Sequence, residues 1–163
     1  MRAAVVALAA GLLTGGCTST PDPPPPATGP VDVPAAPSAA PAARAACTRL
    51  LGDLPDELDP GVRRRPVTDA TRAAAWGDPA IVLVCGVAQP ETSSDPVLIG
   101  PPEGTEFVSF TVRDTGSAQL WTARERTVAV SVSVPDAYDG QVLVPLTGPV
   151  LAALPAAPGA TES

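Results

Sequence analysis

Proline confines the folded part of this chain to its C-terminal portion. Residues 18–43 consist mainly of Pro, Ala, Thr and Ser, lack aromatic residues, and include the run Pro23-Pro24-Pro25-Pro26. Because proline fixes φ and has no backbone N–H, such a segment builds neither a helix nor a hydrophobic core. In a polyproline II conformation it would reach roughly 80 Å, at about 3.1 Å per residue. We therefore expect a disordered spacer over residues 17–43 and one folded domain over residues 44–154.

The first residues have the organisation of a secretory signal. Arg2 is followed by a short apolar run and then by Leu13-Thr14-Gly15-Gly16-Cys17. A charged start, a short apolar core and small residues at a cleavage site are typical of signal peptides, and a membrane-spanning helix needs roughly 20 apolar residues. The run ending in Cys17 matches a lipobox, although Thr14 stands where Leu is commonest. We predict removal of residues 1–16 and a lipid anchor on Cys17; the alternative is a signal that is cut elsewhere.

Charge and composition restrict the function. The ten basic residues are all Arg, there is no His, and the net charge of −7 becomes −8 (−7 − 1) once Arg2 is removed with the signal. A strongly acidic chain argues against nucleic acid as a partner. Hydrolase triads need a base, which is usually His, and Lys is absent as a replacement. We expect a protein that is not an enzyme and has no cofactor or metal, and its Ala, Pro, Gly and Arg usage suggests an actinobacterial source.

The three cysteines predict one disulfide. If Cys17 carries the lipid, Cys47 and Cys85 remain, and an even number in an exported protein indicates a pair. Closing this loop would contribute about 4 kcal/mol on the chain-entropy model. The alternative is two free thiols in the core.

Three segments are predicted to be helical. Residues 44–54 have apolar side chains at helical spacing. Residues 69–76 follow Thr68 and residues 147–154 begin at Thr147, two residues that favour helix N-caps. The last residues, 155–163, are expected to be a disordered tail.

Four segments are predicted to be strands. Residues 81–85 are apolar on both faces, which is typical of a strand in the middle of a sheet. Residues 107–113 and 127–134 alternate apolar and polar side chains, and residues 120–123 form a shorter strand after a turn at 114–117. We therefore predict an α+β domain, with a small antiparallel sheet of four or five strands, helices packed on one face and one disulfide.

Two stretches of the chain resemble a known family. They are the residues beginning at Cys47-Thr48-Arg49-Leu50-Leu51 and the run from Trp76 to Val87; residues 128–135 and Tyr138 extend the likeness. Together they are similar to an actinobacterial lipoprotein family catalogued as domain of unknown function 3515. The resemblance implies an exported, lipid-anchored, disulfide-bonded module, and it supplies no catalytic residues.

Three features are candidates for function. Asp53, Asp56, Glu57 and Asp59 could form an acid–base pair for glycoside hydrolysis or bind Ca²⁺, but a solvated helix end is the better interpretation. Arg63, Arg64 and Arg65 could contact lipid head groups or anionic wall polymers, or pair with the acidic residues before them. Trp121 is a candidate binding-surface residue, and Trp76 is expected to be in the core.

These observations favour a lipid-anchored envelope protein on the outer face of the cytoplasmic membrane. We expect it to be a non-catalytic module that binds an envelope protein or a wall component. The alternatives are a small-ligand binding module, with a pocket between sheet and helices, and a carboxylate-dependent glycoside hydrolase.

Overall fold

The computed structural model describes residues 29–34, 40–91, 95–104 and 106–160. Cys17, the predicted signal and most of the predicted spacer lie outside the described residues. The elements in chain order are α1 (Pro41–Asp53), β1 (Arg64–Arg65), β2 (Ala73–Trp76), β3 (Ile81–Val87), β4 (Val97–Ile99), β5 (Val108–Asp114), β6 (Ala118–Ala123), β7 (Ala129–Pro135), the 3₁₀ helix η1 (Gly140–Leu143) and α2 (Val144–Ala153).

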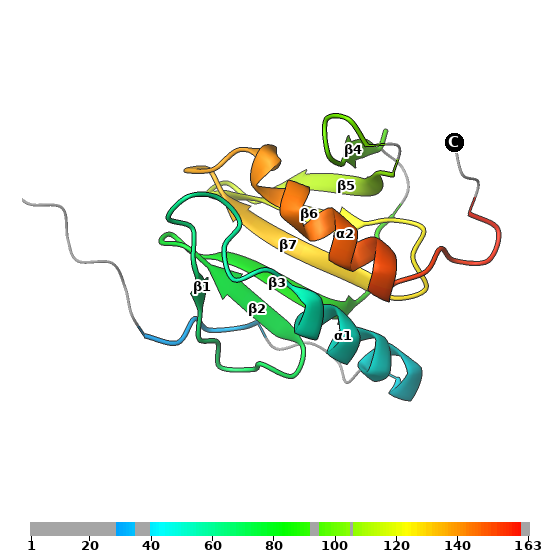
Figure 1. Cartoon of the computed structure of the whole chain (residues 1–163), viewed down its shortest axis with the longest axis horizontal. Helices are drawn as coiled ribbons and strands as arrows, with labels where there is room; N and C mark the ends of the chain where they lie inside the picture. Colours follow the sequence, from blue (N-terminus) through cyan, green and yellow to red (C-terminus); the bar gives the residue numbers. More distant parts are fainter. Residues whose placement is uncertain (1–28, 35–39, 92–94, 105, 161–163) are drawn as a thin grey trace, which may run out of the picture.

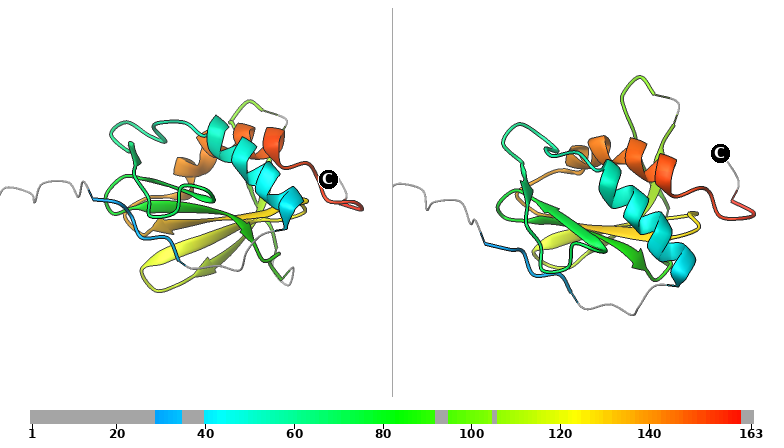
Figure 2. Two further views of the ribbon diagram at one scale, coloured as in Figure 1. Left: turned by 90° about the horizontal axis from the view of Figure 1, so that it is seen from below. Right: turned by 60° about the horizontal axis from the view of Figure 1, so that its bottom comes forward.

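The strands of the described residues form one seven-stranded sheet in the order β1-β2-β3-β7-β6-β5-β4. All neighbours pair antiparallel, and α1, η1 and α2 lie on the same face of the sheet (Figures 1 and 2). The predicted α+β class, with helices on one face, is confirmed. The prediction of four or five strands was too low, because β1, β2 and β4 have two to four residues each and are too short for alternation to be visible.

One predicted helix is a strand. Residues 69–76 form a turn and then β2, whose four residues Ala73–Trp76 are all buried between β1 and β3. Alanine is a strong helix former, but pairing on both sides outweighs local propensity here. Asp69 also accepts hydrogen bonds from the backbone N–H and the hydroxyl of Thr71, at 3.1 and 2.6 Å, which closes a turn instead of a helical cap.

The other two predicted helices are present with earlier starts. α1 begins at Pro41, because proline suits the first helical position. α2 begins at Val144 with Pro145 in its first turn, so Thr147 is inside the helix, where its hydroxyl bonds to the Val144 carbonyl at 2.8 Å.

The four predicted strands are confirmed as β3, β5, β6 and β7, with ends that differ by a few residues. β3 pairs with β2 and β7 in the inner part of the sheet, as its apolar sequence indicated. The core lies between the sheet and the helices, where alternate strand residues meet α1 and α2. Its fully buried members include Leu50, Trp76, Leu83, Val108, Val130, Leu143 and Leu146.

Both ends of the domain extend past the predicted boundaries of 44 and 154. Residues 29–34, here called the N-terminal strap, run beneath the β1–β2 end of the sheet, on the face opposite the helices (Figure 2). The Val31 N–H donates to Pro66 and the Val31 carbonyl accepts from Thr68. After α2, the Pro155 carbonyl accepts from Thr127. Part of the predicted spacer and part of the predicted tail therefore belong to the folded domain.

Within the described residues, neither helix is both long enough and apolar enough to cross a membrane.

Candidate functional site

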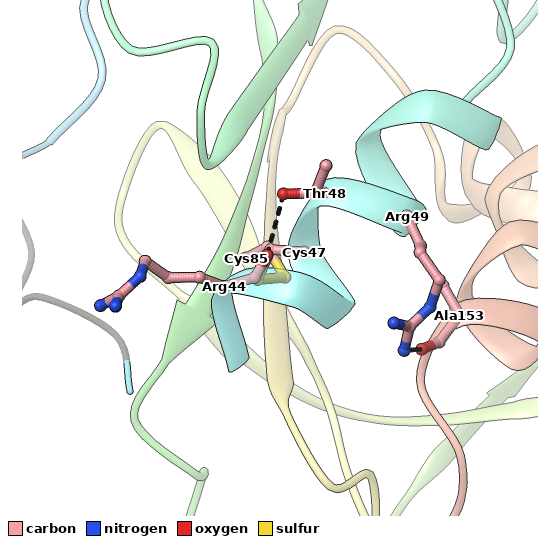
Figure 3. The surroundings of a disulfide bond; sticks show 6 residues. All are labelled: Arg44, Cys47, Thr48, Arg49, Cys85 and Ala153. Carbon is pink, nitrogen blue, oxygen red and sulfur yellow. Dashed lines mark hydrogen bonds between the residues drawn. A yellow bond between two sulfur atoms is a disulfide. The ribbon is translucent and has the colours of Figure 1, made fainter. Parts of the chain in front are cut away.

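The predicted disulfide joins Cys47 of α1 to Cys85 of β3, with Cα atoms 5.6 Å apart (Figure 3). Both residues are buried, at 2% and 1% exposure. Two residues along the same helix, the Arg49 guanidinium donates to the Ala153 carbonyl at the end of α2, at 3.5 Å. The disulfide therefore fixes α1 to β3, while the hydrogen bond from Arg49 connects α1 to α2.

The arginine run does not form one basic surface. Only the Arg63 side chain is largely exposed, at 81%, and it lies 3.7 Å from Glu57. Arg64 points inward: it donates to the carbonyls of Leu51 and Leu54, both at 3.2 Å, and its guanidinium lies 5.6 Å from the Trp76 ring centroid. Cations stabilise helix ends by bonding to the last carbonyls, so Arg64 caps α1.

Arg65 is also used structurally. Its side chain is 15% exposed and donates to the carbonyls of Gly77 and Gly29, at 3.0 and 3.1 Å, beside Asp78 at 3.8 Å. The lipid-binding or polymer-binding role considered for the run is therefore reduced to Arg63. The alternative, pairing with the acidic residues before it, holds for Arg63 and Glu57.

Both tryptophans belong to the core. Trp76 is fully buried and its indole N–H donates to the Pro55 carbonyl at 2.9 Å. Trp121 is 6% exposed and meets Phe110 edge to face, with ring centroids 6.0 Å apart. Gly140 of η1 lies on this ring, because a Cβ there would be 2.8 Å from Cη2. Trp121 is therefore not a surface residue: β6 is an inner strand, and η1 covers it.

The acidic residues at the end of α1 and in the loop after it are exposed to solvent. Asp53, Asp56, Glu57 and Asp59 are all exposed. Glu57 accepts a hydrogen bond from the Gly61 N–H at 2.7 Å. Their placement at an exposed helix end and on an open loop removes the reason for proposing an acid–base pair within this cluster. No group of three or more His, Cys, Asp or Glu in the described part of the chain is arranged to hold a metal ion.

A polar hollow of about 280 Å³ lies beside this loop. Asp59 lines it together with Tyr138, Asp139 and Gln141 from the segment that leads into η1. The Asp139 carboxylate accepts from the Gln141 N–H at 2.9 Å and so caps η1. This hollow is on the outside of the domain, whereas the space between sheet and helices is filled by the buried side chains of the core.

Arg72, paired with Asp69, binds the C-terminal end of the N-terminal strap, at Pro34. The Arg72 Nε donates to Asp69 at 2.8 Å, and another nitrogen of its guanidinium donates to the Pro34 carbonyl. The hydrogen bond from the Thr71 hydroxyl, followed by that from Arg72, lowers the pKa of Asp69 below its ordinary value. The ionised carboxylate therefore orients the guanidinium that contacts the strap.

The most exposed apolar residues could hardly be identified from the sequence. Among the described residues, the exposed large hydrophobic side chains are Val97 at 40%, Leu98 at 58% and Phe107 at 41%. Val97 and Leu98 are in β4, the last strand of the sheet. Phe107 lies beside the end of β4, because a Cβ at Gly100 would be 2.6 Å from its Cδ1. The available signal was the run Val97-Leu98-Ile99 between Pro96 and Gly100, which is too short to identify a strand.

The described surface therefore offers a polar hollow, one exposed arginine from the 63–65 run, Arg63, and one apolar strand edge. Comparison with known proteins adds a family: residues 2–159 match the family described as "Protein of unknown function (DUF3515)". No curated protein matches the chain, and no solved structure does.

Proposed function

Since the chain belongs to the DUF3515 family, for which no activity is described, we propose from its own residues that it is a non-catalytic interaction module of the cell envelope. In this proposal the lipid on Cys17 holds it at the outer face of the cytoplasmic membrane. The domain binds an envelope protein or a wall component there.

The Cys47–Cys85 disulfide is the observation that best supports this proposal. Structural disulfides persist in oxidising compartments and are rare in the cytoplasm. The bond also uses two of the three cysteines, so that Cys17, at the end of the lipobox, is the one left for acylation. A sequence without His or Lys adds support for a role in binding, because the common general bases are missing.

The position of the strap affects how far the domain stands from the membrane. Because residues 29–34 are bound to the domain, the length of the predicted spacer that separates the lipid from the domain is counted from Cys17 to the strap. At about 3.1 Å per residue this stretch spans roughly 40 Å when extended, about half the reach that the sequence suggested. A partner is therefore expected close to the membrane surface.

Crosslinking in intact cells tests the proposal. The full chain is crosslinked, purified from detergent-solubilised membranes and analysed by mass spectrometry, beside a Cys17→Ala control that lacks the anchor. We expect one protein to be recovered with the anchored chain and lost with the control. Equal fractionation of both forms, or turnover of wall sugars or peptides by the purified domain, would contradict the proposal.

The polar hollow supports a second candidate, a module that binds a small polar ligand or a fragment of a wall polymer. A carboxylate, a phenol and an amide from Asp59, Tyr138 and Gln141 line it, and a few convergent polar groups are what orient a ligand. Titrating soluble wall fragments against the domain, with Tyr138→Phe and Gln141→Ala as variants, separates this candidate from the first.

A further inference from the structure

We propose that the edge formed by β4 and Phe107, here called the β4 edge, binds an extended and positively charged segment of a partner protein by strand addition. The inference rests on the proposed function as an interaction module and names the surface and the class of partner. It follows from three independent properties of this edge: its backbone, its apolar side chains and its charge.

The backbone of β4 is available on one side. Among the described residues, β4 ends the sheet and pairs with β5 alone, through Val97 with Phe110, Leu98 with Ser109 and Ile99 with Val108. An edge strand presents N–H and C=O groups to which a further strand can bond, and folded proteins usually shield such edges. Peptides that add to an edge gain affinity from main-chain hydrogen bonds and specificity from alternate side chains.

The β4 edge carries the large apolar side chains that are exposed among the described residues. Val97, Leu98 and Phe107 are the exposed large hydrophobic residues of the described part of the chain. They come from two segments that meet at the end of one strand, since Phe107 lies against Gly100. Exposed apolar residues that gather in one place mark interaction sites, whereas scattered ones are ordinary.

Charge selects the partner. Asp95, Glu103 and Glu106 flank β4 in the chain and are exposed, and the sequence between Arg72 and Arg113 contains no basic residue. Two copies joined edge to edge would bring these carboxylates together, and like charges across an interface oppose association. A segment with Lys or Arg next to its apolar residues complements both properties of the edge.

The opposite end of the sheet shows why β4 is the available edge. There the N-terminal strap forms a parallel bridge from Val31 to Val67, and Arg65 bonds to the strap at Gly29. The chain therefore covers the β1 end with its own backbone. β4 has three residues between Pro96 and Pro101, so an added strand would pair over a short length.

Selection from a random peptide library provides the test. A phage-displayed dodecapeptide library is selected against the chain from residue 17 onward, carrying Cys17→Ser. We expect enriched peptides in which apolar residues alternate with Lys or Arg. Their binding should perturb the NMR signals of the Val97, Leu98 and Ile99 amides. It should also fall by about tenfold or more in the Leu98→Ser/Phe107→Ser variant, because the variant removes two of the three large apolar side chains that are exposed among the described residues and that a bound peptide would cover. Val33→Ser, the same kind of change at the opposite end of the sheet, is the matched control.

Other outcomes overturn this inference. Peptides that perturb another surface, or that bind the Leu98→Ser/Phe107→Ser variant equally well, would show that β4 is not the site, as would a library that yields no binder. Dimerisation of the chain that is lost in this variant would identify a second copy as the occupant. A cellular crosslink that persists in the variant would leave the proposed function standing without the β4 edge.

Discussion

At one end of the sheet β1 lies beside a segment of its own chain, whereas at the other end β4 pairs, within the described part of the chain, with β5 alone (Figure 1). The β1 end is held by the N-terminal strap, by the hydrogen bonds of Arg64 and Arg65 to backbone carbonyls and, at β3, by the disulfide. The β4 end has exposed apolar side chains and acidic neighbours, and no basic residue lies between Arg72 and Arg113.

The difference separates the end of the sheet that is tied to the rest of the chain from the end for which we propose recognition. Each contact at the β1 end joins segments that are distant in sequence, and such contacts are strongest when they are buried or charge-assisted. Apolar side chains left in water at β4 contribute little to folding and favour association. Changes at the β1 end should therefore alter stability, and changes at the β4 end should alter binding.

The largest effect is expected from removing the disulfide. Replacing Cys47 and Cys85 together by Ala should lower the free energy of unfolding by about 4 kcal/mol, because the loop of 38 residues is no longer closed in the unfolded chain. Urea unfolding of the variant and of the parent, each with and without reductant, measures the difference. An unchanged urea midpoint would mean that the stability of the domain does not depend on the disulfide between α1 and β3.

Loss of the Arg64 guanidinium is expected to have the next largest effect. Arg64→Met keeps the apolar stem but removes the hydrogen bonds to Leu51 and Leu54 and the contact with Trp76. The free energy of unfolding should fall by about 2 kcal/mol, since hydrogen bonds from charged groups are worth more than neutral ones. Arg63→Met is the control: its side chain is 81% exposed, and surface changes usually stay within about 0.5 kcal/mol. Equal losses in both variants would contradict the assignment of Arg64 as the cap.

These arginines illustrate what could and could not be predicted from the sequence. Long alternating strands, the first helix and the disulfide were predictable because each leaves a periodic or countable pattern. The three adjacent arginines look alike in sequence. Arg64 and Arg65 are distinguished only because they pair with Trp76 and Ala75 of β2, which places the two arginine side chains on opposite faces of the sheet. β2 was missed for a related reason: Ala73, Ala74 and Ala75 have no alternation, so their strand depends on partners far along the chain.

The strap should contribute less than Arg64. Val31→Pro removes the N–H that donates to the Pro66 carbonyl at 2.8 Å, and one neutral hydrogen bond is worth about 1 kcal/mol. The Thr68 N–H, which donates to Val31 at 3.0 Å, should then exchange with solvent faster, while the amides of β5 keep their rates. Hydrogen exchange measured by NMR, with Asp32→Ala as the control, tests this. Unchanged exchange at Thr68 would show that the β1 end is shielded without the strap.

The smallest expected effect is that of pH on the strap. The pKa of Asp69 is lowered in the folded protein, first by the Thr71 hydroxyl and then by Arg72, so the folded state favours the carboxylate. This stabilisation is complete above the unfolded value of 3.8 and is lost as the pH falls through the lower folded value. An NMR titration of the carboxyl carbon should therefore have its midpoint below 3.8, and Thr71→Val should move it upward.

Protonation of Asp69 also removes the charge that orients Arg72 toward the Pro34 carbonyl. Below the folded pKa of Asp69, the Thr68 amide hydrogen should exchange with solvent faster than the pH dependence of intrinsic amide exchange explains. In the Asp69→Asn variant, this faster exchange should be present already at neutral pH. The β4 amides are the internal reference, because no contact with Asp69 links them to the strap in the described chain. Parallel changes at Thr68 and at Leu98 would mean that acid loosens the whole domain and that the two ends of the sheet are not independent.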